Sequence, residues 1–277
     1  MSSQQPRITI CIPHWQVRVY MTLCLRSIRR HSGKYNLEVI VIDNGSRDDS
    51  LDYLRSLDWI RLIERPEEVH TNWPTNVFTA WDRGLAEATG EYFITMHSDV
   101  FVKQDGWLDP FLREITRAPD IAAAGAWKLE LEHPLYAMQK QAVGFVGTQL
   151  KKLIGRQKKR YRGIGCYPRD YCAMYRRDIL RNEALQFRPL AGQTGGGYSI
   201  AKQIQDAGYR MGMIPVREMA ANIYHVAHGT AAVVREKPLH HQRAQRKVEQ
   251  KVSGLFDEPW ILALEADESL DCPRQAA

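Results

Sequence analysis

A carboxylate and an imidazole follow a buried strand at His97-Ser98-Asp99, within the stretch GEYFITMHSDVFVK at 90–103. The β-branched and aromatic residues of Tyr92–Met96 predict a strand inside a sheet, which we expect to continue through 100–102 after the polar residues. An oxygen and a nitrogen ligand at a strand end could bind a divalent metal. Ser and Asp also favour turns because their side chains hydrogen-bond to nearby backbone. These three residues therefore predict either a metal site or a capped turn.

Two other predicted strands, Arg7–Pro13 and Leu37–Ile42, also end in polar residues. The second is a continuous β-branched run, which is typical of a parallel strand covered on both faces. The polar residues at these ends are Pro13 and His14, then Asp43 and Asn44. Carboxyl ends of parallel strands lie along one edge of a sheet, where open α/β sheets bind ligands. We therefore expect the strand ends to share a site, with an acidic group on a base or ribose and another on a diphosphate-bound metal.

Strands alternate with segments of helical period, which predicts a mostly parallel, Rossmann-like α/β sheet with helices on both faces. A C-terminal helical extension follows this sheet. Ser46 or Asp48 is expected to cap the second helix. The first turn has no GxGxxG and the chain has no GxxxxGK[ST], which argues against a Rossmann dehydrogenase and a P-loop enzyme. Further helices are expected at Tyr20–His31, Asp49–Ser56, Asn76–Ala88 and Tyr198–Ala207, and further strands at Trp59–Glu64 and Tyr171–Tyr175.

The composition is that of an ordinary soluble globular protein, with 44% apolar and 25% charged residues in 277. No apolar run approaches the roughly 18 residues needed to span a bilayer. The N-terminal MSSQQPR is polar and predicts no secretory signal. Five cysteines without metal spacing argue against a disulfide framework. We therefore expect a reducing, cytoplasmic location.

The net charge of +6 is unevenly distributed. No Asp or Glu lies between His133 and Arg169, and Lys151–Arg162 reads KKLIGRQKKRYR. This basic block predicts an anionic partner, whether nucleic acid, the inner face of an anionic membrane or a phosphorylated substrate, unless it is only a solvated loop. Pro238–Leu255 predicts a basic amphipathic helix that either packs on the domain or lies on lipid. An acidic tail follows it.

Residues 7–125 resemble the N-terminal half of an inverting family 2 glycosyltransferase, which has the nucleotide-sugar-binding GT-A fold. The matching segments, in order, are ITICIPHW, LEVIVIDNGSRDDSLDYL, AWDRGLAEATGEYFITMHSDVFV, GWLDPFLREI and AAAGAW. CAMYRRDIL, AGYRMGMIP and NIYHVAHG resemble the acceptor half of the family. The resemblance implies a GT-A domain at 1–232, divided at 125/126, with a basic insert at 139–162. The basic helix and acidic tail at 233–277 lie outside it.

The resemblance also implies roles for individual residues. The family's DxD motif, which holds metal and diphosphate, maps to His97-Ser98-Asp99. A late metal-binding histidine maps to His225, so His97, Asp99 and His225 would hold Mn²⁺ or Mg²⁺. The implied nucleotide-sugar-binding residues are Pro13, His14, Asp43, Asn44, Asn76, Asp82, Ser98 and Asp99.

The sequence departs from the family pattern at two points. His97 replaces the first acidic residue of DxD, although imidazole also binds divalent metals. Where relatives place an aspartate as base, this chain has Gln193 in a glycine-rich segment, and an amide cannot take a proton from an acceptor hydroxyl. Asp170 is the substitute candidate. The alternative is a turn carboxylate paired with Arg169 or Arg176.

These observations predict a metal-dependent transferase that moves a sugar from a nucleoside-diphosphate donor to a hydroxyl. The acceptor would be a glycan, a lipid-linked molecule or a natural product, and inversion is implied by the resemblance. One alternative is a glycosyltransferase that modifies nucleic acid, for which the basic block would contact phosphates. Another is a non-catalytic protein that binds sugar nucleotides, which the changes at His97 and Gln193 suggest.

Overall fold

The computed structural model describes residues 5–66, 73–129, 165–189, 196–227, 229 and 252–272. Three of the sequence-based predictions therefore lie outside the described residues. They are the role of Gln193, the basic insert at 139–162 and most of the basic helix predicted at 238–255.

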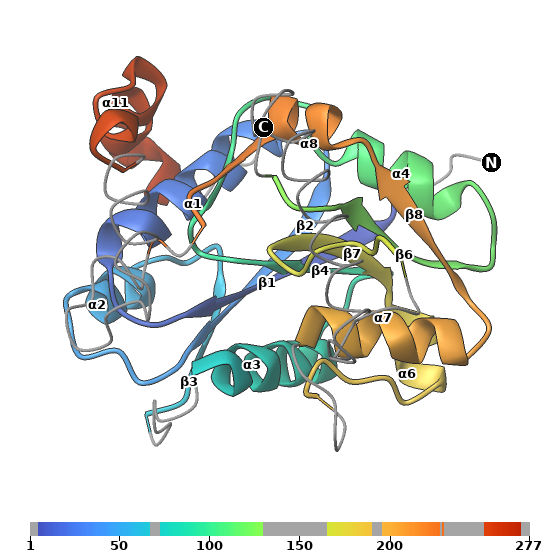
Figure 1. The fold of residues 1–277 in the computed structure, drawn as a ribbon. Helices are drawn as coiled ribbons and strands as arrows, with labels where there is room; N and C mark the ends of the chain where they lie inside the picture. The colour runs from blue at the N-terminus through green and yellow to red at the C-terminus, as the bar shows by residue number, and fades with distance from the viewer. Residues whose placement is uncertain are drawn as a thin grey trace, which may run out of the picture.

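A seven-stranded sheet in the order β3-β2-β1-β4-β7-β6-β8 forms the centre of the fold (Figure 1). Every neighbouring pair is parallel except the two that involve β7, which runs antiparallel to β4 and β6. The predicted mostly parallel sheet is thus confirmed. The strands are β1 Arg7–His14, β2 Asn36–Asp43, β3 Arg61–Glu64, β4 Tyr92–Met96, β6 Ile121–Ala126, β7 Cys172–Arg176 and β8 Arg210–Ile214.

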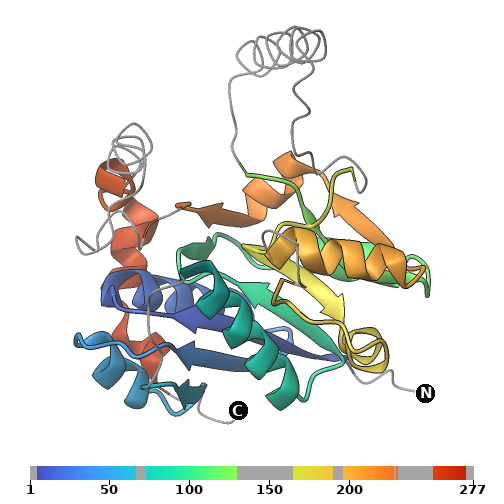
Figure 2. The ribbon, with the colours of Figure 1, turned by 60° about the horizontal axis from the view of Figure 1, so that its bottom comes forward.

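Helices cover both faces of this sheet, as predicted (Figures 1 and 2). The helices α3, α6 and α7 lie on one face and α1, α2 and α4 on the other, and each face has its own hydrophobic core. Alternate residues of β1 supply the two cores, because Ile10 faces α1 whereas Cys11 faces α3. The helices are α1 Arg18–His31, α2 Ser50–Arg55, α3 Trp73–Glu87, α4 Asp109–Thr116, α6 Arg177–Asn182, α7 Gly196–Asp206, α8 Val216–Asn222 and α11 Pro259–Glu265.

The strand β5, Val100–Val102, does not continue in the main sheet, which corrects the expectation from sequence. It pairs antiparallel with β9, Ile223–His225, in a separate two-stranded sheet. The change of sheet begins at the turn after β4, where the N–H of Val100 donates to the carbonyl of His97 (3.2 Å). The sequence could not reveal this, because β5 is apolar and fully buried like a strand of the main sheet.

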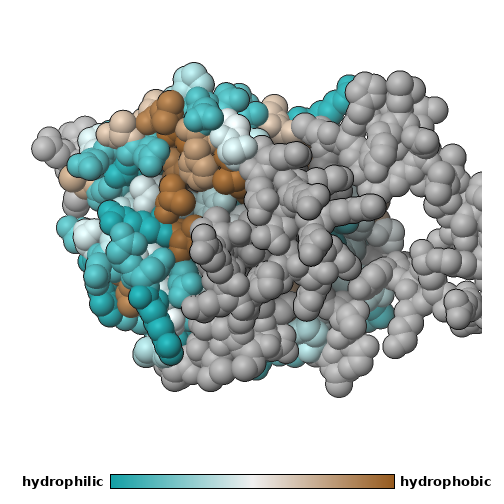
Figure 3. Space-filling view, turned by 60° about the vertical axis from the view of Figure 1, so that its left-hand side comes forward, coloured by the Kyte–Doolittle hydropathy of each residue, from teal (hydrophilic) through white to brown (hydrophobic). Residues whose placement is uncertain are grey.

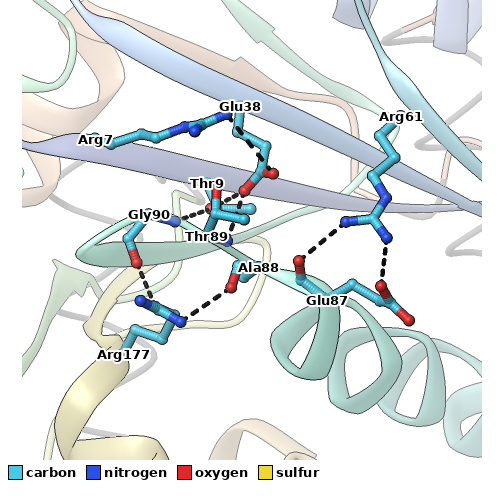
Figure 4. Close-up of polar contacts among 9 residues, drawn as sticks. All are labelled: Arg7, Thr9, Glu38, Arg61, Glu87, Ala88, Thr89, Gly90 and Arg177. Atoms are coloured by element: carbon cyan, nitrogen blue, oxygen red, sulfur yellow. Dashed lines mark hydrogen bonds and ion pairs between the residues drawn. The ribbon is translucent and has the colours of Figure 1, made fainter.

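A polar cluster fixes the turn between α3 and β4, at the end of the sheet where strands β1 and β4 begin (Figure 4). The Glu38 carboxylate accepts hydrogen bonds from the Thr9 hydroxyl (2.6 Å) and the Thr89 N–H (2.9 Å). The Gly90 N–H donates to the Thr9 hydroxyl oxygen (2.9 Å), and the Arg177 guanidinium donates to the Gly90 carbonyl. A Cβ at Gly90 would lie 2.6 Å from the Thr9 nitrogen, so this contact requires glycine. The cluster therefore fixes where β4 begins.

The described part of the C-terminal segment packs on α1. Arg26, buried in α1, donates to the Asp271 carboxylate through Nε (3.0 Å) and Nη2 (2.6 Å), and Tyr53 also donates to Asp271 (2.9 Å). Ile261 and Leu264 of α11 are buried in the same core as α1. On the side that carries α11, Figure 3 shows hydrophobic residues gathered beside polar ones. Among the described helices, none is long and apolar enough to cross a membrane.

Replacing Asp271 with alanine should lower the free energy of unfolding by about 3 kcal/mol, because the buried guanidinium loses its carboxylate partner and keeps only backbone carbonyls as hydrogen-bond acceptors. Urea unfolding would measure this as a lower midpoint with an unchanged slope. The matched control is Glu218→Ala, which removes an exposed ion pair with Arg113 and should cost about 0.5 kcal/mol. Equal losses in the two variants would contradict a stabilising role for the Arg26–Asp271 contact.

Candidate functional site

Three strand ends meet at one edge of the main sheet. His14, the last residue of β1, pairs in register with Asp43, the last residue of β2. Register partners on parallel strands project to the same face, so both side chains point toward α1 and α2. β4 lies on the other side of β1 and ends just before His97. The structure therefore arranges the three predicted polar groups in the order Asp43, His14, His97 along the edge.

The His14 imidazole is buried and neutral at pH 7. Its Nε2 lies 2.8 Å from the hydroxyl of Ser50, while its Nδ1 is buried without a hydrogen-bond partner among the described residues. Burial lowers the pKa of His14 to about 4, although the charges of Asp43 and Asp48 act in the opposite direction. A neutral imidazole with one unpaired nitrogen can bind a polar ligand atom.

Asp43 combines a structural contact with an unpaired oxygen. Its Oδ2 accepts hydrogen bonds from the N–H groups of Gly45 and Ser46 (both 3.0 Å), which forms the turn after β2. Its Oδ1 is buried and has no partner in the described structure. The neighbouring Asn44 accepts a hydrogen bond from Arg65 (2.9 Å). Because buried polar atoms are normally satisfied, the unpaired Oδ1 suits a ligand donor.

The loop after β1 holds two non-glycine residues in the left-handed region, Gln16 at φ 54° and Val17 at φ 63°. Such conformations cost about 1–2 kcal/mol per residue. The Ser46 hydroxyl accepts from the Gln16 N–H and the Asp48 carboxylate from the Val17 N–H, both at 2.8 Å. The Asp48 carboxylate also accepts from the backbone N–H of Ser50 (3.3 Å), so of the two expected caps of the second helix Asp48 contacts its first turn, whereas Asp49, directly before α2, makes no side-chain cap bond. Sequence pattern alone gives no sign of this strained loop.

The ligand atoms of His97, Asp99 and His225 lie within 4.8 Å of one another, an arrangement that could hold a metal ion. Asp99 Oδ1 lies 3.9 Å from His97 Nδ1 and 3.5 Å from His225 Nε2. Neither Asp99 Oδ1 nor His225 Nε2 has a hydrogen-bond partner among the described atoms, although both are buried. These orphaned ligand atoms fit a divalent cation.

The groups around Asp99 favour the ionised form of its carboxyl. Burial raises the pKa of its carboxyl, but His225, then His97 and the Gly229 N–H, outweigh this and hold the pKa well below its usual range. The Gly229 N–H donates to Oδ2 at 2.9 Å, which leaves Oδ1 facing the histidines. Sequence analysis missed the contribution of Gly229, and the only signal for it is its closeness to His225 in the chain.

Two other predicted ligands, Asn76 and Asp82, lie on α3. Asn76 is buried. The Asp82 carboxylate accepts from the backbone N–H groups of Phe187 (2.6 Å) and Arg188 (3.2 Å) and pairs with the Arg188 guanidinium (2.9 Å). Asp82 thus holds the loop before α7, and its contact with a ligand stays a prediction, as do those of Pro13, Asn76 and Ser98.

Asp170 lies against the start of α7. A Cβ on Gly197 would lie 3.1 Å from the Asp170 carboxylate carbon, a tight contact that any larger residue could make only if the carboxylate moved. The next residue, Tyr171, stacks on the His225 ring with centroids 4.6 Å apart. Asp170 therefore lies at the N-terminus of α7, and the residue that follows it in the chain contacts one of the possible metal ligands.

The arginines that sequence analysis offered as partners of Asp170 make other contacts. The Arg169 guanidinium lies 5.5 Å from the centroids of the Trp127 and Tyr167 rings and donates to the Tyr167 hydroxyl (2.8 Å). Arg176 donates to the carbonyls of Ile115 and Ile121. Neither forms an ion pair with Asp170 in the described part of the chain.

The sequence matches the family model described as Glycosyl transferase family 2 over residues 9–183. A dolichyl N-acetyl-alpha-D-glucosaminyl phosphate 3-beta-D-2,3-diacetamido-2,3-dideoxy-beta-D-glucuronosyltransferase of Methanococcus voltae is 26% identical over 122 residues, which are 43% of this chain and 38% of that protein. An uncharacterized glycosyltransferase of Haemophilus influenzae is 23% identical over 146 residues, 53% of this chain and 42% of that protein. The matches thus span less than half of these relatives.

Solved structures share the fold. A mannosyltransferase from Pyrobaculum calidifontis, in complex with GDP-Man and Mn²⁺, has a TM-score of 0.57 at 17% identity and covers 97% of this chain and 70% of its own. TarS of S. aureus, in complex with UDP-GlcNAc, has a TM-score of 0.51 at 13% identity and covers 79% of this chain and 58% of its own. The GT-A fold expected from the sequence is thereby confirmed.

The buried His14 should make stability depend on pH. Unfolded, the imidazole binds a proton below about pH 6.5, whereas in the folded protein its pKa is about 4. The unfolded state therefore binds more protons between these two pH values. The contribution of His14 to the free energy of unfolding is fully present above pH 6.5 and is lost toward pH 4, a change of about 3 kcal/mol. Denaturant unfolding from pH 4 to 7 would measure it. The His14→Gln variant should lack this part of the pH dependence, and an unchanged profile would contradict the assignment.

Proposed function

Because the chain belongs to glycosyl transferase family 2, we propose that it transfers a sugar from a nucleoside-diphosphate donor to an acceptor hydroxyl, using Mn²⁺ or Mg²⁺. The observation that carries the proposal is the row of buried, unpaired polar atoms along one sheet edge. His14 Nδ1 and Asp43 Oδ1 lie at the ends of β1 and β2, and Asp99 Oδ1 lies just beyond the end of β4. The structural neighbours that bind GDP-Man and UDP-GlcNAc support it.

The strand order suggests how the donor lies. The nucleoside would contact Asp43, Asn44 and His14 at the ends of β2 and β1, and the diphosphate would extend toward β4. Asp99, His97 and His225 would hold the metal, whose positive charge would stabilise the leaving diphosphate. The lowered pKa of the Asp99 carboxyl, caused by His225, His97 and the Gly229 N–H, favours this role.

Asp170 would act as the general base. Its carboxylate would accept the proton of the acceptor hydroxyl while the acceptor oxygen attacks the sugar carbon from the side opposite the diphosphate. The bond between that carbon and the diphosphate oxygen breaks, so the configuration inverts. Two observations support this role, the close approach of Asp170 to Gly197 at the start of α7 and its sequence neighbour Tyr171 stacked on His225.

Two half-buried aromatic side chains, Trp127 and Tyr198, pack on the buried Tyr167 and suit a carbohydrate acceptor. The Trp127 and Tyr167 rings meet edge to face at 5.0 Å, and Tyr167 meets Tyr198 of α7 at 6.2 Å. Aromatic rings offer apolar platforms to sugar faces. We therefore propose a glycan or a lipid-linked or natural-product glycoside as the acceptor.

The test is a panel of UDP-, GDP- and dTDP-sugars, measured by thermal shift and by release of the nucleoside diphosphate, with and without Mn²⁺. A donor that binds should raise Tm by mass action, and the metal should increase the effect. Failure of every donor to bind or to be hydrolysed would reject the proposal. Binding without hydrolysis or transfer would favour the non-catalytic alternative.

Asp43→Asn should raise the donor KM by about 10- to 100-fold with little change in kcat, because a ligand donor loses its acceptor. The amide oxygen can still accept from Gly45 and Ser46, so the turn after β2 should remain. Asp52→Asn, an exposed change on α2, is the control and should leave KM unchanged. A lower kcat at unchanged KM would place Asp43 away from the donor.

Asp170→Asn should lower kcat by about 10²- to 10⁴-fold, the usual contribution of a general base, while the donor Kd stays unchanged. The pH dependence of kcat should lose its acidic limb, which a purely structural residue would not affect. Asp178→Asn, at an exposed position on α6, should retain full activity. Full activity of the Asp170 variant would show that another residue takes the proton.

A further inference from the structure

The three possible metal ligands combine one carboxylate with two imidazoles. Two atoms bound to one ion at about 2.1 Å each lie at most about 4.2 Å apart. The distances from Asp99 Oδ1 to His225 Nε2 (3.5 Å) and to His97 Nδ1 (3.9 Å) fall within this limit. The two imidazole nitrogens lie within 4.8 Å of each other, so a shift of one ring would bring all three ligand atoms to one ion, and two of the three are nitrogen.

Neighbouring aromatic rings fix the orientation of both imidazoles. The His97 ring stacks on Trp81 of α3, with centroids 5.5 Å apart and planes inclined by 22°. Trp81 is itself fully buried and donates its Nε1 hydrogen to the Cys11 carbonyl (3.2 Å). The His225 ring stacks on Tyr171 at 4.6 Å and 19°. Because each ring has a face covered, its nitrogens are presented at a fixed edge, as preorganised ligands require.

The carboxylate contribution is limited to one oxygen. Asp99 Oδ2 accepts the Gly229 N–H, so only Oδ1 faces the histidines. Mg²⁺ prefers oxygen ligands and loses its bound water reluctantly. Because this group offers only one carboxylate oxygen, we expect it to bind Mg²⁺ weakly. Imidazole favours later divalent ions such as Fe²⁺, Co²⁺ and Zn²⁺, for which affinity generally rises from Mn²⁺ onward.

We propose that this group selects transition-metal ions that bind imidazole, such as Co²⁺, Fe²⁺ or Zn²⁺, over Mg²⁺, and that His97 sets this selectivity. Replacing its nitrogen with a carboxylate oxygen would shift the preference back toward Mg²⁺. The inference rests on the proposed function only in that the ion serves the donor diphosphate. Ion binding itself can be measured without any donor.

The experiment is calorimetric titration of the full chain, without donor, with Mg²⁺, Mn²⁺ and Co²⁺. Visible absorption of the Co²⁺ form reports nitrogen ligands directly. The parent should bind Co²⁺ at least about 100-fold more tightly than Mg²⁺. In His97→Asp this ratio should fall at least about tenfold, and the Co²⁺ spectrum should change, since one nitrogen is replaced by oxygen.

Two variants serve as controls. Asp99→Asn should lose affinity for all three ions. His31→Asn alters another histidine beside an aspartate, since His31 Nδ1 lies 2.8 Å from Asp105 Oδ1, and it should leave every Kd unchanged. An equal Co²⁺-to-Mg²⁺ ratio in the parent and His97→Asp overturns the inference.

The outcomes also separate this inference from the proposed function. The expected ion selectivity in a protein that neither binds nor hydrolyses any nucleoside-diphosphate sugar would sustain the inference and reject the function. Sugar transfer supported equally by Mg²⁺ and Co²⁺, with no effect of His97→Asp on ion binding, would sustain the proposed function and reject the inference.

Discussion

The candidate metal site depends on the pairing of β5 with β9, because this pairing joins two segments that are far apart in the chain. Val100 pairs with His225, and the N–H of Val226 donates to the Asp99 carbonyl at 3.0 Å. These backbone contacts bring the residues after β4 next to the residues after β9. Asp99 then reaches both His225 and the Gly229 N–H. A buried carboxylate is costly to ionise without such partners, so the small sheet is a condition for the charge at the site.

Two glycines at the start of α7 allow close contacts with α3 and with Asp170. A Cβ on Gly196 would lie 2.2 Å from the Phe78 ring of α3, and one on Gly197 would meet Asp170. The start of α7 can therefore lie against both α3 and the residues before β7. In the structure these glycines permit tight packing of the helix start. The constraint they satisfy is steric, and it is visible only when the neighbours are known.

Much of the main sheet could be predicted from sequence because its strands have simple patterns. Continuous apolar runs such as 37–42 indicate parallel strands covered on both faces, and polar residues directly after them indicate the binding edge. The exit of β5 from the main sheet and the left-handed residues Gln16 and Val17 could not be predicted, because both depend on contacts with distant segments. At the candidate site the structure brings the ligand atoms of His97, Asp99 and His225 within 4.8 Å of one another, whereas sequence analysis gives no sign of the contacts from Gly229 and Tyr171.

A continuous set of contacts links the C-terminal segment to the group of possible metal ligands. Tyr20 of α1 packs against Phe256, with ring centroids 6.0 Å apart. The Tyr20 ring also lies close to Gly229, since a Cβ on Gly229 would be 3.1 Å from the Cζ atom of Tyr20. Burial and the charge of Asp99 raise the pKa of Tyr20 to about 12, so its hydroxyl stays protonated beside the carboxylate. Arg26, on the same helix, is held by Asp271. Helix α1 thus contacts both the segment at 252–272 and the backbone near Asp99. This segment therefore supports the site from behind α1, although none of its described residues is among the possible metal ligands.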